Sequence, residues 1–135
     1  MLFFFCYFAR NCIIMSMNLI ADSGSTKTAW CLVCDGQIVK QFETPGINPF
    51  FQTEDEIVAQ LKDGLLPEVG DNCVENVYFY GAGCANPEKN RALERLLMCV
   101  VGAKTAFVKK SKYKFIGYNK KAILTRRGGG DTIII

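Results

Sequence analysis

Residues 19–33 read LIADSGSTKTAWCLV, in which two apolar runs flank the polar sequence DSGST. Apolar and β-branched residues on both sides of a glycine-containing turn predict a strand, a turn and a second strand. Gly24 allows the backbone to approach an anion closely, and Asp22 offers a carboxylate of the kind that magnesium prefers. We interpret the segment as a phosphate-binding hairpin. An ordinary tight turn is the alternative, because any such turn uses the same residue types.

The polar residues of this hairpin are the candidate nucleotide ligands. Hydroxyl groups can donate hydrogen bonds to phosphate oxygens, and a lysine adds a positive charge. The pattern GxxxxGK[ST] is absent, so the segment is not a Walker loop. The predicted cofactor-binding residues are Asp22, Ser23, Gly24, Ser25, Thr26 and Lys27. This chemistry predicts ATP and Mg²⁺ as cofactors.

The residues that follow predict further strands and two helices. Asp35-Gly36 between apolar runs is a strong hairpin signal. Thr53 and Glu56 form a capping box that opens a helix, and Pro67 is expected to end it. Pro87 opens a second helix. The predicted strands are residues 18–21, 28–33, 37–44 and 77–80, and the first predicted helix is residues 54–66.

Three segments resemble the actin-like ATPase and sugar-kinase superfamily, specifically the BadF/BadG/BcrA/BcrD-type ATPases and N-acetylglucosamine kinase-like proteins. They are IADSGSTKTAWCLV (residues 20–33), TPGINPFFQT (44–53) and VYFYGAGC (77–84). The resemblance covers roughly residues 17–101 and corresponds to the N-terminal domain only. It implies an α/β, ribonuclease-H-like (actin-like ATPase) fold that is truncated, with three antiparallel strands followed by a helix, a strand and a helix.

The resemblance also implies roles for individual residues. Asp22 would hold the magnesium of the nucleotide through water, while Gly24 and Thr26 would present donors to the phosphates. Lys27 would either assist them or point to solvent. No catalytic residue is identified, because the aspartate that serves the family as general base has no counterpart here. We therefore expect little or no kinase activity from this chain alone.

The predicted substrate residues are Asn48, Gly81 and Gly83. In sugar-kinase relatives an asparagine at the position of Asn48 contacts sugar hydroxyls, which an amide can both donate to and accept from. Ordinary Asn-Pro turn chemistry is the alternative for Asn48. A plain tight turn is the alternative for the two glycines. Phe50 and Phe51 could stack on a sugar ring, but we expect at least one of them in the core.

The function that the resemblance implies is that of an ATP-dependent sugar kinase of the N-acetylglucosamine type, which transfers a phosphoryl group from ATP to a sugar hydroxyl. A BadF-type ATPase that activates a partner enzyme is an alternative from the same superfamily. The Gly46-Ile47-Asn48-Pro49 loop favours the kinase. A non-catalytic basic binding module is an alternative from a different class. The expected partner is an amino sugar, without a specific nucleic acid or a membrane, and full-length relatives are expected to be homodimers.

The 135 residues suffice for one domain, which we place at residues 17–103. Residues 1–16 form an apolar N-terminal extension that we interpret as preceding the true start at Met15 or Met17. Residues 1–103 carry seven basic and twelve acidic groups, whereas 104–135 carry nine basic groups and only Asp131. We favour an out-of-frame or disordered tail for 104–135. Lysines interleaved with aromatic residues keep a single-strand nucleic-acid binder as the alternative.

Histidine and cysteine usage narrows the chemistry further. The chain has no histidine, which excludes mechanisms that depend on a histidine base. The CxxC spacing of Cys31 and Cys34 falls on a predicted strand, where the two side chains point to opposite faces. Seven cysteines without a clear export signal favour reduced thiols and a cytoplasmic location.

Overall fold

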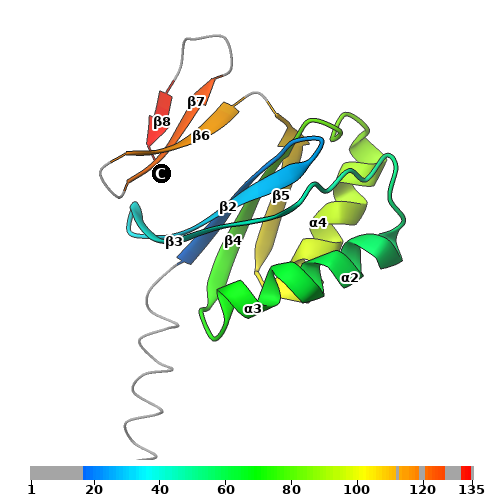
Figure 1. The fold of residues 1–135 in the computed structure, drawn as a ribbon, viewed down its shortest axis with the longest axis horizontal. Helices are drawn as coiled ribbons and strands as arrows, with labels where there is room; N and C mark the ends of the chain where they lie inside the picture. The colour runs from blue at the N-terminus through cyan, green and yellow to red at the C-terminus, as the bar shows by residue number, and fades with distance from the viewer. Residues whose placement is uncertain (1–16, 112, 119–120, 127–131, 135) are drawn as a thin grey trace, which may run out of the picture.

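The computed structural model of the chain describes residues 17–111, 113–118, 121–126 and 132–134. The predicted extension at residues 1–16 lies outside the described residues. Figure 1 shows an α/β arrangement in which a central sheet carries helices on one face. This is the α/β class that the sequence predicts.

Five strands, in the order β5-β4-β1-β2-β3, form the central part of an eight-stranded sheet. The first three are antiparallel neighbours: β1 (Met17–Ser23), β2 (Lys27–Cys34) and β3 (Gln37–Pro45). β4 (Val74–Gly81) runs parallel to β1, and β5 (Thr105–Lys110) runs parallel to β4. The predicted order of three antiparallel strands, helix, strand and helix is confirmed.

The turn between β2 and β3 confirms the predicted Asp-Gly hairpin. Asp35 and Gly36 have φ angles of 51° and 74°, so both occupy the left-handed region. A two-residue hairpin turn of the primed type requires this conformation at both central positions, and aspartate and glycine adopt it at little cost. The turn sets the pairing next to it, and the register shifts farther along, between Leu32 and Val33.

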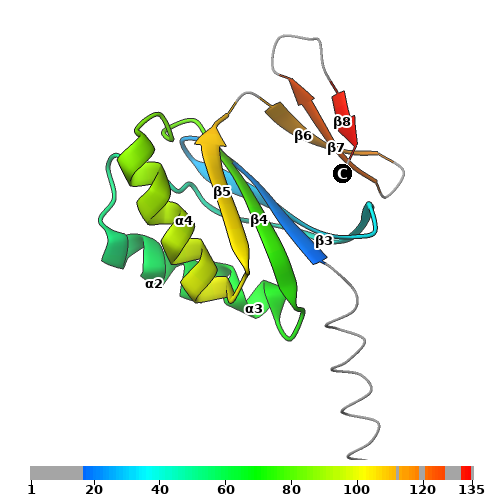
Figure 2. The ribbon, with the colours of Figure 1, turned by 180° about the vertical axis from the view of Figure 1, so that it is seen from behind.

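Helices α2 (Glu54–Gly64), α3 (Leu66–Val69) and α4 (Pro87–Val101) cover one face of the sheet (Figure 2). The capping box before α2 is present: the Thr53 side chain accepts from the Glu56 N–H at 3.2 Å, and the Glu56 carboxylate accepts from the Thr53 N–H at 2.9 Å. Pro67 does not end one long helix as predicted. The helix breaks at Leu65, and Pro67 lies in the first turn of α3, where its missing N–H costs no helical bond.

The main core lies between the sheet and the helices. Trp30 lies in this core and is 1% exposed. Its ring stacks on Phe42 with ring centroids 6.2 Å apart, and its Nε1 donates to the Thr44 hydroxyl at 2.8 Å. Side chains alternate along β1, so Leu19 and Ala21 face the helices while Ile20 joins a smaller cluster on the opposite face. The other large, fully buried core residues are Phe79, Leu32, Ile47, Leu61, Leu65, Leu93 and Leu97.

Strand β5 extends the sheet beyond residue 103, where the sequence analysis ended the domain. Ala106 and Val108 are buried against the core, while Phe107 and Lys109 alternate with them and are exposed. Farther along, β6 (Tyr113–Tyr118), β7 (Lys121–Arg126) and β8 (Thr132–Ile134) pair antiparallel in chain order. β7 meets β3 at the single pair Gln37 and Lys121. The out-of-frame or disordered tail and its alternative, a nucleic-acid binder, both stay predictions.

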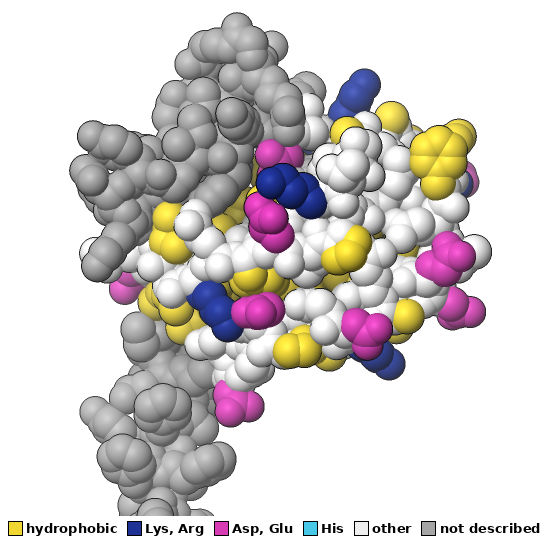
Figure 3. Space-filling view, viewed as in Figure 1, with side chains coloured by type: hydrophobic (Ala, Val, Ile, Leu, Met, Phe, Trp, Pro, Cys, Tyr) yellow, Lys and Arg dark blue, Asp and Glu magenta, His cyan; other side chains and the backbone are white. Residues whose placement is uncertain are grey.

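The helical surface of the molecule is charged. The first turn of α2 carries Glu54, Asp55 and Glu56, and Figure 3 shows acidic side chains spread over this helix. Carboxylates at this end of a helix are favoured by the partial positive charge of the unpaired N–H groups. Among the described residues, no helix has the length and apolar character that crossing a membrane requires.

Candidate active site

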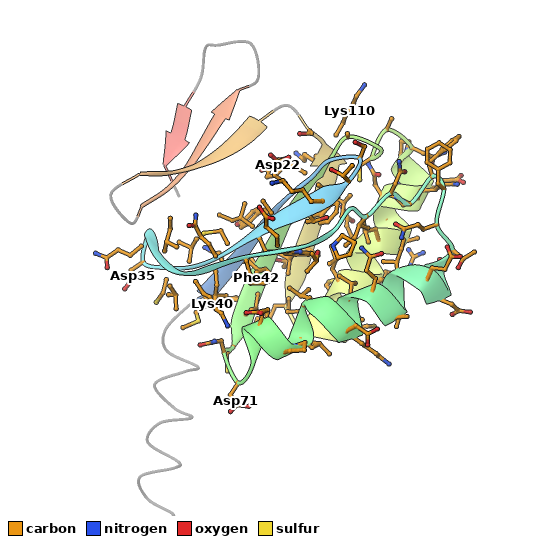
Figure 4. The ribbon with its side chains drawn as sticks, viewed as in Figure 1. Asp22, Asp35, Lys40, Phe42, Asp71 and Lys110 are labelled. Carbon is orange, nitrogen blue, oxygen red and sulfur yellow. The ribbon has the colours of Figure 1, made fainter. Side chains whose placement is uncertain are left out.

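The carboxyl ends of β1, β4 and β5 meet at one edge of the sheet, because these strands run parallel. The Ala82 N–H donates to the Ser23 carbonyl at 3.0 Å, and the Ser111 N–H donates to the Gly81 carbonyl at 3.0 Å. In Figure 4, Asp22 and Lys110 lie toward this edge, whereas Asp35 and Asp71 lie at other ends of the molecule. Ligands of open α/β sheets bind outside the carboxyl ends of the strands, so this edge is the candidate site.

Asp22 lies at this edge on the sheet face that points away from the helices, in alternation with Ala21. It is half-buried, and the Ser111 hydroxyl lies 3.4 Å from its Oδ1. The described residues contain no group of three or more histidine, cysteine or acidic side chains that could hold a metal. Hard oxygen atoms around one carboxylate fit Mg²⁺, which takes one or two protein carboxylates and leaves its remaining positions to phosphates and water.

The crest of the β1–β2 turn presents hydroxyl groups to solvent. Ser25, Thr26 and Lys27 are exposed. The Gly24 N–H, which the sequence analysis expects to face a phosphate, donates to the Lys27 carbonyl at 2.9 Å and closes the turn. The Lys27 ammonium pairs with Glu43 at 3.1 Å in an exposed ion pair. The side chains of Ser25 and Thr26 are therefore the accessible donors of the turn.

Ser23 has a structural role that differs from its predicted one. It is 1% exposed, and its Oγ lies 2.8 Å from the Thr28 hydroxyl. The same oxygen donates to the Ile47 carbonyl at 3.1 Å and accepts from the Ile47 N–H at 2.9 Å. A hydroxyl has one proton and two lone pairs, so these contacts use its capacity. Ser23 joins the β1–β2 turn to the loop of residues 45–48, and its side chain is too buried to contact a ligand.

The loop of residues 45–48, here called the Asn48 loop, lies directly against the β1–β2 turn, the predicted phosphate turn. The Gly46 N–H donates to the Thr26 carbonyl at 3.0 Å. A Cβ at Gly46 would lie 2.7 Å from the Gly24 carbonyl oxygen, closer than packed atoms normally approach. Glycine is therefore required at Gly46 by close backbone contact, a role that sequence analysis did not assign to it.

Asn48 lies next to Gly83, and the sequence analysis names both as substrate residues. A Cβ at Gly83 would collide with the Asn48 side-chain amide, so the two residues are in contact across the loop and the β4–α4 connection. Asn48 Oδ1 accepts from the Phe50 N–H at 2.9 Å. Gly81 is different: it is buried, and a Cβ there would lie 2.6 Å from the Cys84 sulfur. Gly81 therefore has a packing role, whereas Gly83 contacts the side chain of Asn48.

Neither Phe50 nor Phe51 is in the core, contrary to the expectation for at least one of them. Phe50 is 61% exposed and Phe51 is 80% exposed, and their rings meet edge to face at 5.1 Å. The Lys89 ammonium lies 4.8 Å from the Phe50 ring centroid. The turn capped by Asn48 Oδ1 directs both rings outward, which the apolar character of phenylalanine alone does not predict.

A hollow of about 220 Å³ lies between α2 and α4, beside this loop. Pro49 and Gln52 bound it on the loop side, and Ile57 and Leu93 bound it on the helical side. None of the predicted cofactor or substrate residues lines it. The hollow is therefore separate from the edge of the sheet at which Asp22 lies.

Two glutamines brace the loop from the side of α2. Gln60 Nε2 donates to the Pro45 carbonyl at 2.7 Å and to the Gly46 carbonyl at 3.1 Å, and Gln60 Oε1 accepts from Gln52 at 2.9 Å. Gln52 Oε1 accepts from the Asn48 N–H at 2.7 Å. The sequence analysis identified neither glutamine. Gln60 lies 15 and 14 positions from Pro45 and Gly46, too far for a local sequence pattern, whereas Gln52 is only four positions from Asn48.

The buried thiols of Cys31 and Cys84 are unreactive at neutral pH. Burial raises the pKa of Cys84 to about 11 and the pKa of Cys31 to about 12. Both therefore stay protonated at neutral pH, and a protonated thiol is a poor nucleophile and metal ligand.

The chain is similar in fold to a solved structure of a candidate kinase. No protein-family model and no curated protein sequence matches the chain. Among solved structures, a candidate N-acetylglucosamine kinase from Porphyromonas gingivalis superposes with a TM-score of 0.68 and 40% identity, over 72% of this chain and 35% of that one. The fold is ribonuclease-H-like. The chain spans about a third of the length of this neighbour.

Proposed function

We propose that this chain forms the nucleotide and sugar site of an ATP-dependent kinase for an amino sugar of the N-acetylglucosamine type. One observation carries the proposal: the phosphate turn and the Asn48 loop are in direct contact through the Gly46 N–H and the Thr26 carbonyl. A kinase must hold the phosphate donor and the sugar acceptor side by side, since phosphoryl transfer depends on positioning and charge stabilisation. The similarity to a candidate N-acetylglucosamine kinase supports the same function.

The residues divide into two sets by position. The carboxylate of Asp22 would hold the magnesium of MgATP, and this ion would supply charge neutralisation between the phosphates. Ser25 and Thr26 provide the accessible hydroxyl donors. Asn48, in contact with Gly83, provides an amide for the sugar hydroxyls. Because the chain spans 35% of the neighbour, residues outside this segment would complete phosphoryl transfer, and we expect binding without turnover.

The nucleotide part of the proposal is tested by titrating the full chain with a non-hydrolysable ATP analogue and Mg²⁺, followed by calorimetry. We expect Asp22→Asn to weaken binding by about tenfold or more, because a charge-assisted contact to the ion is lost. Asp35→Asn is the matched control, since it makes the same change in the β2–β3 turn and asparagine tolerates a positive φ. Absence of nucleotide binding, or equal effects of the two variants, would contradict the proposal.

The sugar part is tested separately with N-acetylglucosamine. We expect Asn48→Ala to lower the affinity for the sugar by about tenfold while leaving nucleotide affinity within about twofold. Asn72→Ala is a suitable control, because Asn72 bonds the Val69 carbonyl at the end of α3. Unchanged sugar affinity in Asn48→Ala would remove this residue from the site.

A further inference from the structure

The segment of residues 45–48 is held on two sides. On the sheet side, Ser23 bonds both the N–H and the carbonyl of Ile47, and the Gly46 N–H bonds the Thr26 carbonyl. On the helix side, the amide of Gln60 donates to the carbonyls of Pro45 and Gly46. The loop therefore spans the space between the phosphate turn and α2, and both attachments use hydrogen bonds of ordinary length.

Gln60 reaches Asn48 through a second glutamine. Gln60 Oε1 accepts from Gln52 Nε2 at 2.9 Å, and Gln52 Oε1 accepts from the Asn48 N–H at 2.7 Å. Both the NH2 group and the carbonyl oxygen of the Gln60 side chain are hydrogen-bonded. Gln60 therefore fixes the rotamer of Gln52, and Gln52 fixes the backbone of Asn48. The backbone in turn sets the direction of the Asn48 amide, whose Oδ1 is held by the Phe50 N–H at 2.9 Å.

We propose that Gln60 is a positioning residue of the sugar site, which holds the Asn48 loop at its distance from the phosphate turn. Gln60 lies on α2 and bonds the loop backbone and Gln52, so it acts through other residues. The effect on sugar binding rests on the proposed function, whereas the effect on the loop does not. Groups that bind a ligand need support from surrounding hydrogen bonds to keep a productive geometry.

The substitutions separate the donor role of Gln60 from simple packing. Gln60→Ala removes all of its hydrogen bonds and keeps a strong helix former in α2. Gln60→Glu keeps the size of the side chain but replaces the donating amide by a carboxylate, which cannot donate to the two loop carbonyls. Lys62→Ala is the control, because Lys62 is exposed in the last turn of the same helix.

Two measurements on the full chain test these variants, one of loop opening and one of ligand binding. Hydrogen exchange of the Asn48 amide, measured without ligand, reports whether the loop opens, since this N–H depends on Gln52. Calorimetric titration with N-acetylglucosamine and with the magnesium-bound ATP analogue reports the two binding sites. Thermal melting of each variant verifies that it is folded.

We expect both Gln60 variants to exchange the Asn48 amide about tenfold faster and to bind N-acetylglucosamine about tenfold more weakly, with nucleotide affinity changed by less than about twofold. Lys62→Ala should match the wild type. Unchanged exchange in Gln60→Ala, or full recovery in Gln60→Glu, overturns the positioning role. If the wild type binds no sugar while exchange still rises in both variants, the proposed function fails and the positioning of the loop stands.

Discussion

The β1–β2 hairpin has a crest and a base that carry the same chemical groups in opposite surroundings. At the crest, Ser25 and Thr26 are exposed to solvent. At the base, Ser23 and Thr28 are 1% and 0% exposed, and their hydroxyls lie 2.8 Å apart. The base is bonded to the Asn48 loop through Ile47, whereas the crest is available for a ligand.

This difference separates two functions that a run of serines and threonines does not distinguish. Ser23 and Thr28 are opposite each other in the β1–β2 ladder and face the helix-covered side of the sheet. Their hydroxyl groups therefore lie in the apolar core and must form hydrogen bonds with other groups of the protein. The exposed hydroxyls make no such demand on the fold, so changes at the crest should affect binding and changes at the base should affect stability.

The largest contrast is expected between two alanine substitutions of glycine. At Gly46 the new Cβ would lie 2.7 Å from the Gly24 carbonyl oxygen and 3.1 Å from that of Ser25, and both atoms belong to the backbone. We expect Gly46→Ala to lower the free energy of unfolding by about 3 kcal/mol. At Gly24 the nearest atom would be 3.7 Å away, so Gly24→Ala should cost less than about 1 kcal/mol. Urea denaturation measures both, and equal losses would break the contrast.

The next contrast is between the two serines. Ser23→Ala leaves the Ile47 N–H and carbonyl without their partner in a buried site, and we expect a loss of about 2 kcal/mol in the free energy of unfolding. Ser25→Ala should change stability by less than about 0.5 kcal/mol and weaken nucleotide binding instead. Chemical denaturation and calorimetric titration of the same two variants give the answer. A stable Ser23→Ala protein would show that Ile47 finds another partner.

A pH titration extends the comparison to buried and exposed thiols. The pKa of Cys31 is raised to about 12 and that of Cys84 to about 11, so both thiols contribute stability that is fully present below the ordinary thiol pKa. The unfolded chain ionises first as the pH rises, and this stability is lost progressively up to the folded pKa. Each thiol should lower the free energy of unfolding by up to about 1.4 kcal/mol per pH unit above roughly pH 9. Cys84→Ala should flatten this slope, and urea denaturation of the wild type and the variant between about pH 8 and about pH 11 measures the difference.

The smallest effect is expected for the charged pair at the crest. The side chains of Lys27 and Glu43 are 64% and 61% exposed, so solvent screens their attraction. A double-mutant cycle with Lys27→Ala and Glu43→Ala should give a coupling below about 0.5 kcal/mol, reduced further by added salt. A coupling well above that value would mean that the crest helps to hold β2 and β3 together.

Local patterns predicted most of the fold. The Thr53 and Glu56 capping box and the Asp35-Gly36 turn depend on residues within a few positions of one another, and both are present. The first three strands were predicted within two residues at each end for the same reason. β5 is not predicted from the sequence, because its buried alternation of Ala106 and Val108 is short and lies within the basic composition after residue 103.

The candidate site was less predictable, because its contacts join residues far apart in the chain. Ser23 and Ile47 are separated by 24 positions, and Gln60 and Pro45 by 15. No spacing rule reveals such pairs. The turn sequence identified which residue types were chemically suitable, but only the three-dimensional arrangement showed that Ser23 supports the site and that Ser25 and Thr26 face the solvent.

Trp30 gives the molecule an optical property that follows from its packing. It is the only tryptophan among the 135 residues, and it is 1% exposed. An indole enclosed by Phe42 and Phe79 emits at shorter wavelength than one in water, so the tryptophan fluorescence reports a single position in the core. Its Nε1 bonds Thr44, whose hydroxyl lies 3.3 Å from the Pro45 carbonyl that Gln60 also contacts. Thr44 therefore links this loop to the indole of Trp30. A movement of the loop should change the tryptophan fluorescence, so loop movement can be followed without an added label.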